Sequence, residues 1–183
     1  MTTQIETKFC AAIIDAFQAN KRLAERAIAQ VSDESLHVPL DEYTNSIAVN
    51  MKHIAGNLIS RWTQFLTSDG EKPTRNRDSE FVDTFNTRQE VLDYWEEGWS
   101  CLFAELNALT ARELHSSVVI RGETQDIPLA MSRSLGHTCY HIGQIVQLAR
   151  HHAGDNWTTL TIPPGGSEQF NQENWGPSGK SHS

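Results

Sequence analysis

Hydrophobic residues recur at every third or fourth position over four stretches of the chain, residues 4–31, 45–66, 87–109 and 128–153. This is the period of an α-helix that buries one of its sides. The second stretch shows it most clearly, because its stripe consists of Ile47, Met51, Ile54, Leu58, Trp62 and Phe65. The pattern predicts four long helices of similar length around one core, which is an all-α four-helix bundle.

Residues that favour helix ends mark several of these boundaries. Asn45 or Ser46 can cap the second helix, and Thr87-Arg88-Gln89-Glu90 has the capping-box pattern at the start of the third. Pro128 suits the first position of the fourth helix, and Gly154 suits the position just after its end. We therefore expect the last three helices to begin close to these residues.

The second and third helices are joined by a long connection. Residues 67–85 include Gly70, Pro73, Asn76 and Asp78, which have the chemistry of turns. Loops longer than about 12–15 residues are uncommon unless they have a task, such as covering a site. We expect a surface loop here.

A small β-hairpin is predicted before the fourth helix. The segment 117–121 is rich in β-branched residues, Gly122-Glu123 has the pattern of a turn, and 124–127 can pair back. From about residue 155 onward the sequence contains Pro163-Pro164-Gly165-Gly166 and predicts an irregular tail. The length of 183 residues suits a single domain over residues 1–183.

Composition and charge narrow the classes of protein. The chain has 38% hydrophobic residues, lacks the roughly 20-residue apolar run of a membrane span, and begins without a signal-peptide pattern. Its three widely spaced cysteines are typical of a reducing compartment. The net charge of -8, with no run of Lys or Arg, would repel a phosphate backbone. We expect a cytoplasmic protein with no nucleic acid and no membrane among its partners.

The strongest chemical signal is the pair His137 and His141 in the fourth helix. Residues four apart on a helix lie on one face, about 5–6 Å apart at Cβ, so both imidazoles can bind one ion. Gln144 continues the same face and is a candidate to orient a ring or hold a water. Spacing alone is equally compatible with two structural histidines, so a third ligand is needed to decide.

The second helix offers that ligand in His53. It belongs to a polar stripe that also contains Asn50, Asn57 and Arg61, set apart from the hydrophobic stripe. Such a stripe can simply be solvated, but the small residues beside His53, Gly56 among them, would let another helix approach. Three neutral imidazoles with an open position are typical of a catalytic metal site, and they leave zinc, nickel, iron or manganese open.

These segments resemble a known family. One histidine in the second helix together with His-x-x-x-His in the fourth resembles the DinB/YfiT-like family of metalloenzymes, and the matching segments are Met51–Leu58 and Leu135–Gln144. Two further segments resemble an uncharacterised DinB-like subfamily of small bacterial proteins, namely Arg61–Pro73 and Pro164–Asn171.

The resemblance implies an up-up-down-down bundle that binds one divalent metal, zinc first, through His53, His137 and His141. It also implies homodimers and, in characterised relatives, thiol-dependent transferase or isomerase activity, in which a low-molecular-weight thiol is the substrate. Gln144 and Asn57 are then candidates for contacts behind the ligands.

Three functions stay open at this point. The first is a metal-dependent enzyme, a thiol-dependent S-transferase or a hydrolase acting on a small molecule, although no residue is clearly placed as its general base. The second is a non-catalytic, dimeric metal-binding module, for instance in a stress response. The third is a helical scaffold whose histidines are incidental. Metal content separates the third function from the other two.

Overall fold

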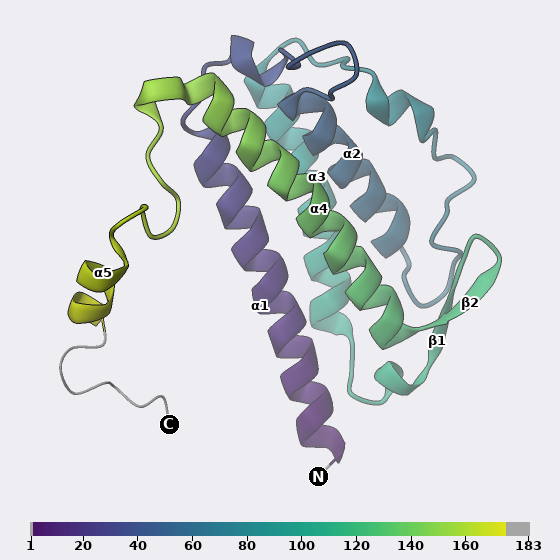
Figure 1. The fold of residues 1–183 in the computed structure, drawn as a ribbon. Helices are drawn as coiled ribbons and strands as arrows, with labels where there is room; N and C mark the ends of the chain where they lie inside the picture. The colour runs from purple at the N-terminus through teal and green to yellow at the C-terminus, as the bar shows by residue number, and fades with distance from the viewer. Residues whose placement is uncertain (1, 175–183) are drawn as a thin grey trace.

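The computed structural model describes residues 2–174 and is mainly helical (Figure 1). The helices are α1 (Thr2–Ile28), α2 (Ile47–Trp62), α3 (Arg88–Ala108), α4 (Ile127–Ala153) and α5 (Ser167–Asn174). Four short 3-10 turns lie between them: η1 (Glu34–Leu36), η2 (Asp78–Phe81), η3 (Glu113–His115) and η4 (Gly154–Asn156). The predicted hairpin is confirmed, since β1 (Ser117–Ile120) and β2 (Glu123–Asp126) pair antiparallel directly before α4.

The predicted helix starts are confirmed by their capping hydrogen bonds. The Val49 N–H donates to Ser46 Oγ at 3.2 Å, and the Glu90 N–H donates to Thr87 Oγ1 at the same distance. Proline stands in the first turn of α4, and Gly154 follows the helix with a φ of 52°. Each cap satisfies backbone groups that have no partner within the helix.

The predicted ends of the first two helices are wrong. The first helix stops at Ile28 rather than residue 31, and the second at Trp62 rather than residue 66. The chain turns at Gln64, whose φ is 51°, and the Phe65 ring then stacks on Trp62 at 4.4 Å. The hydrophobic stripe thus continues past the end of the helix because Phe65 folds back onto it. With 16 residues against 27 in α1 and in α4, α2 is not of similar length.

The tail also differs from the expectation. The sequence predicts an irregular segment from about residue 155, yet Ser167–Asn174 forms α5. Side chains four residues apart stabilise it, since Gln169 Nε2 donates to Glu173 Oε1 at 2.8 Å. The remainder of the predicted tail, 175–183, lies outside the described residues.

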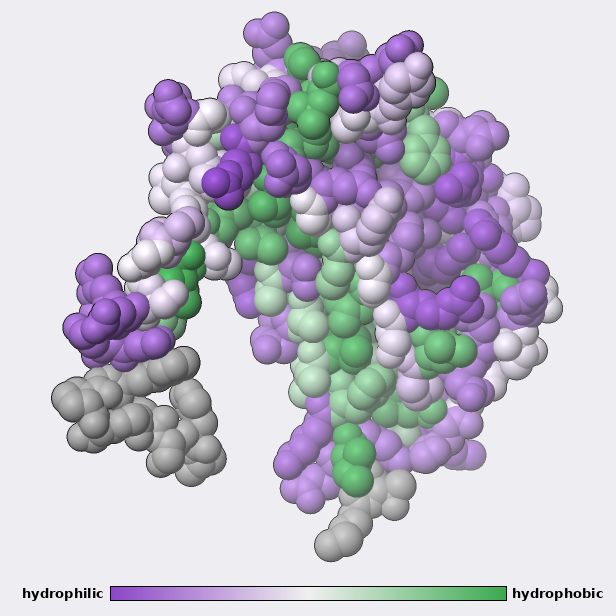
Figure 2. Space-filling view, viewed as in Figure 1, coloured by the Kyte–Doolittle hydropathy of each residue, from purple (hydrophilic) through white to green (hydrophobic). Residues whose placement is uncertain are grey.

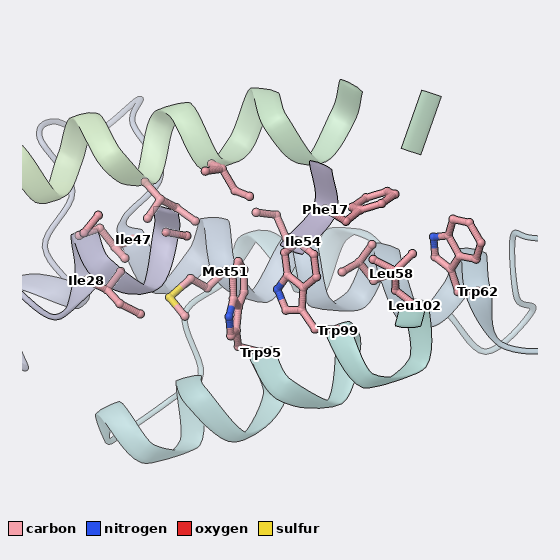
Figure 3. Packing of buried hydrophobic residues seen from close by; sticks show 14 of the residues in the cluster. Phe17, Ile28, Ile47, Met51, Ile54, Leu58, Trp62, Trp95, Trp99 and Leu102 are labelled. Carbon is pink, nitrogen blue, oxygen red and sulfur yellow. The ribbon is translucent and has the colours of Figure 1, made fainter. Parts of the chain in front are cut away.

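The core lies between the long helices, and α2 has the most central place in it. Helix α2 packs against α3 and α4, while α1 packs against α4. Aromatic side chains fill the space between them, among them Phe17, Trp62, Trp95 and Trp99 (Figure 3). A Cβ on Gly98 would stand 2.6 Å from Ala55 Cα, so α2 and α3 touch at their backbones. The side of α2 that carries His53 faces α4 and the long loop.

The surface has two distinct sides. Hydrophobic residues gather along α1 and α4, whereas the side formed by the long loop and the hairpin is mostly hydrophilic (Figure 2). Within residues 2–174, no helix combines the length and the hydropathy that crossing a membrane requires.

Candidate metal centre

Three histidines meet where α2 and α4 pack together. One nitrogen of each of His53, His137 and His141 lies within 4.8 Å of the corresponding atoms of the other two. The ring centroids are 4.7 to 5.2 Å apart. His53 is only 3% exposed, His141 is 8% exposed and His137 is half-buried. The two helices therefore bring the predicted residues together, and the cluster could hold a metal ion.

The distance between the nearest nitrogens of His53 and His137 is close to that expected for two ligands of one metal ion. His53 Nε2 and His137 Nε2 are 3.2 Å apart. Two nitrogens that each bind one ion at about 2.1 Å with a tetrahedral angle are about 3.4 Å apart. The separations of up to 4.8 Å are longer, so small rotations of the rings would draw the third nitrogen in. The donor set and its spacing fit a divalent transition metal.

His53 is fixed from behind by the long loop. Its Nδ1 donates to Glu80 Oε2 at 2.8 Å, and Arg75 donates to both oxygens of the same carboxylate at 2.7 and 2.9 Å. Phe81 stacks on the imidazole with 4.6 Å between centroids. With its proton held on Nδ1, His53 presents a lone pair at Nε2. Carboxylate–histidine pairs of this kind orient metal ligands in proteins.

The charge of Glu80 is stabilised although the residue is buried. Burial by itself would raise the pKa of this carboxyl, but hydrogen bonds from His53 and Arg75 outweigh it and hold the pKa below its usual value. Gly56 makes room for the carboxylate, since a Cβ at that position would stand 2.7 Å from Glu80 Oε1. The sequence predicts that the small residue beside His53 admits another helix, whereas in the structure it admits the loop.

His141 has a neutral partner instead. Its Nδ1 lies 3.2 Å from Oδ1 of Asn50, a residue of α2 that is 1% exposed. Burial lowers the pKa of His141 to about 4, the nearby His53 adds to this, and a hydrogen bond that the ring donates to Gln144 opposes it. The imidazole is therefore neutral near pH 7, which is the form that binds metals.

His137 is the least supported of the three. Its Nδ1 is buried and has no hydrogen-bond partner among residues 2–174. Burial, followed by the proximity of His141 and His53, lowers its pKa to about 4. His137 is thus also neutral near pH 7, but no described residue holds its Nδ1 as Glu80 holds that of His53.

One protein-family model matches this chain. A model described as "protein of unknown function (DUF1572)" matches residues 4–166, which include the three histidines, Arg75 and Glu80. The chain belongs to this family. No curated protein and no solved structure matches it. Because the description of DUF1572 gives no activity, the function has to be argued from the site, and the resemblance to DinB/YfiT-like proteins stays a prediction.

Two cavities open beside the histidines of this DUF1572 protein. The larger, of about 830 Å³, is lined by all three histidines and also by Gln144 and Tyr140. The smaller, of about 380 Å³, is lined by His137 alone of the three, together with Asn57 and Arg61. The two residues expected behind the ligands therefore lie in different cavities, Gln144 in the larger and Asn57 in the smaller.

The residues that support the histidines in this DUF1572 chain do not stand out in the sequence. Glu80 and Arg75 lie in the loop, where no periodicity marks an inward position. Asn50 is visible in the sequence as part of the polar stripe, but a solvated face explains that stripe equally well. The one available signal is the length of the loop, which predicts a task without naming the residues that perform it.

Proposed function

We propose that this DUF1572 protein is a divalent-metal-dependent enzyme whose ion is bound by His53, His137 and His141, with zinc as the first candidate. The observation that supports this most directly is the convergence of three mostly buried imidazoles from two helices within 4.8 Å. Three such ligands leave a position open to water or substrate, as in catalytic rather than structural zinc sites.

The class of reaction follows from that open position. A bound divalent ion lowers the pKa of a water or a thiol and so supplies a nucleophile near neutral pH, for hydrolysis or thiol-dependent S-transfer. The protein's own part is to orient the ligands. Glu80 holds the proton of His53 on Nδ1, and Asn50 accepts from Nδ1 of His141, so both rings present Nε2 to the same point. The larger cavity gives a small molecule access to all three rings.

The remaining features extend the same proposal. We assign the four long helices to an up-up-down-down bundle of the DinB-like type, which the packing of α1 on α4 and of α2 on α3 and α4 supports. The hydrophobic face along α1 and α4 supports a homodimer (Figure 2). These assignments fit a cytoplasmic protein that acts on a small molecule, for example a low-molecular-weight thiol.

A non-catalytic metal-binding module is the second candidate, and one observation favours it. The carboxylate next to the cluster, Glu80, already accepts hydrogen bonds from His53 and Arg75. It is therefore not free to act as a general base for a substrate, which a hydrolase of this kind would need.

Metal content tests the site itself. Purified wild-type protein should contain a stoichiometric divalent metal by elemental analysis, and His53→Ala or His137→Ala should lose it, because each removes one of three ligands. His151→Ala is the matched control, since this exposed histidine lies on α4 outside the cluster. Substoichiometric metal in the wild type after incubation with zinc, nickel, iron or manganese would end the proposal.

The wild type, His151→Ala and a further variant, His141→Ala, separate an enzyme from a binding module. Each is mixed with a small thiol and an electrophile, and thiol consumption is followed. An enzyme of the proposed kind shows activity in the wild type and in His151→Ala that is lost in His141→Ala. Metal binding with no activity that depends on His141 would favour the non-catalytic module.

A further inference from the structure

The smaller cavity is built from three separate parts of the chain. Helix α2 contributes Asn57 and Trp62, the hairpin contributes Ile120 and Arg121, and α4 contributes Arg133 together with His137. The hairpin tip is fixed in place, because Asp69 accepts hydrogen bonds from the backbone N–H groups of Arg121 and Gly122, each at 2.8 Å. The walls of the cavity are thus held in position before any ligand binds.

Three polar side chains of this cavity keep hydrogen-bonding capacity that no partner within residues 2–174 uses. The carboxamide of Asn57 is 9% exposed and makes no hydrogen bond to another described residue. The exposed guanidinium of Arg133 makes no ion pair there. Ser134 Oγ accepts from Trp62 Nε1 at 3.1 Å, and its own hydroxyl hydrogen is left to donate. These groups line the cavity, where water or a ligand can satisfy them.

The other cations of the cavity already have a carboxylate partner. Arg61 and Arg121 both donate to Glu71 Oε2, at 3.1 and 2.9 Å. Arg133 is the cation of the cavity that has no carboxylate partner within residues 2–174, and Glu123, which also lines the cavity, is the group that opposes an anion. Trp62, Phe65 and Ile120 supply apolar walls. The volume of about 380 Å³ is within the range of small-molecule sites, roughly 300–1,000 Å³.

We infer that this cavity binds the carboxylate of a small, partly apolar organic anion, with Arg133, Asn57 and Ser134 as donors. A guanidinium can donate two parallel hydrogen bonds to the two oxygens of a carboxylate. This bidentate pairing favours a carboxylate over a neutral ligand. Arg133 precedes His137 by one helical turn, about 5–6 Å, so an anion held there extends to the metal centre. The inference rests on the proposed function in one respect, since it makes the anion the substrate of that centre; binding itself requires only the cavity.

The test uses metal-free protein, so that a carboxylate cannot bind through the ion. Phenylacetate is titrated into the wild type by calorimetry, with phenylacetamide as the neutral analogue and inorganic phosphate as the competing anion. The variants are Arg133→Met and Asn57→Ala. The control is Arg150→Met, an exposed arginine of α4 about 25 Å further along the helix. Glu123→Gln removes the opposing charge.

We expect phenylacetate to bind at least about tenfold more tightly than phenylacetamide, and Arg133→Met to weaken it about tenfold, as for loss of a charged hydrogen bond. Asn57→Ala should weaken it by a few fold, Glu123→Gln should strengthen it, and Arg150→Met should leave it unchanged. Equal binding of acid and amide, no binding of either, or equal effects of Arg133→Met and Arg150→Met would overturn the inference. Tighter binding of phosphate would overturn the carboxylate assignment.

The two proposals fail in different ways. Zinc binding by the wild type without phenylacetate binding removes the anion site and leaves the metal site in place. Binding of phenylacetate that depends on Arg133, in a protein that binds no metal, supports the anion site and removes the proposed function.

Discussion

His53 and His137 face each other across 3.2 Å, yet their surroundings differ. Behind His53 stand the carboxylate of Glu80, the guanidinium of Arg75 and the ring of Phe81, all from the long loop. Behind His137 there is no hydrogen-bond partner among residues 2–174, and two cavities meet its ring. One side of the centre is closed by a buried ion pair, and the other opens onto the cavities.

This difference indicates a division of tasks. The α2 side fixes the position and the tautomer of a ligand, at the cost of burying a carboxylate and a guanidinium. On the α4 side, where no described residue holds Nδ1 of His137, the ring can adjust to an ion, and the adjoining cavities offer space for a substrate. Changes on the α2 side should therefore affect stability and metal affinity together, whereas changes on the α4 side should affect mainly binding and its pH dependence.

The largest effect is expected from Glu80→Ala. The side chain of Arg75 is 5% exposed and would keep only Glu71 as a counterion, while His53 would lose its acceptor. Leaving a buried charge without its partner costs about 3 kcal/mol in the free energy of unfolding. Loss of a group that orients a ligand lowers metal affinity about 10- to 100-fold. Urea unfolding and a zinc titration measure the two effects.

Two variants sharpen this result. Arg75→Met combined with Glu80→Gln removes both buried charges, so it should recover most of the stability but not the metal affinity. Gln144→Ala, on the α4 side, should change the free energy of unfolding by less than about 0.5 kcal/mol. If Glu80→Ala and Gln144→Ala behaved alike, the two sides would not differ as described.

The next effect is the pH dependence of the free energy of unfolding of the metal-free protein. The two histidines of α4 should dominate it. Above pH 6.5, His137 and His141 are neutral in both the folded and the unfolded chain, so neither contributes. Between pH 6.5 and about 4, the unfolded chain binds protons that the folded rings, with pKa values of about 4, do not accept. Stability therefore falls as the pH decreases through this window, by at most about 1.4 kcal/mol per pH unit for each ring, and less for the half-buried His137.

A double variant isolates this contribution. His137→Gln combined with His141→Gln cannot titrate in that range, so its stability should fall less steeply between pH 6.5 and 4 than that of the wild type. Carboxyl groups such as Glu80 are common to both proteins and cancel in the difference. Parallel curves in urea unfolding experiments across this range would show that the two imidazoles are not held neutral.

The two sides also differ in how far the sequence predicts them. The α4 side follows from periodicity, because His137 and His141 are four residues apart on one helix whose start and end are marked by Pro128 and Gly154. His53 is placed by the same logic on α2. The contacts of the α2 side do not follow, because Glu80 and His53 are 27 positions apart in the sequence and only the path of the loop after α2 brings them together.

Helix lengths and polar positions show the same limit. The stripe of the second helix extends to Phe65, but the chain turns at Gln64 and only the packing of Phe65 on Trp62 explains the pattern. Asn50 is 1% exposed although it lies on a polar stripe, since burial depends on what covers a face. Local rules predict elements and pairs within them, whereas contacts made by a loop depend on the whole fold.

The smallest effect is expected from replacing one glycine by alanine on each side of the centre. Replacing glycine by alanine within a helix stabilises it by about 1 kcal/mol where space allows. A Cβ on Gly136 of α4 would meet no atom of a neighbouring element within 4 Å, so Gly136→Ala should gain this amount and leave zinc affinity unchanged. At Gly56 on α2 the new carbon would stand 2.7 Å from Glu80 Oε1, so the carboxylate must shift away from its present position.

Gly56→Ala should therefore gain less stability than Gly136→Ala and bind zinc a few fold more weakly, since Glu80 can no longer hold His53 Nδ1 at 2.8 Å. The pair of variants has the same chemical change in the same kind of element, so intrinsic helix preference cancels between them. The difference that remains reports how closely the loop is fitted to α2. Equal stability and equal zinc affinity in the two variants would mean that the carboxylate adjusts freely, and the closed side of the centre would then be no more constrained than the open one.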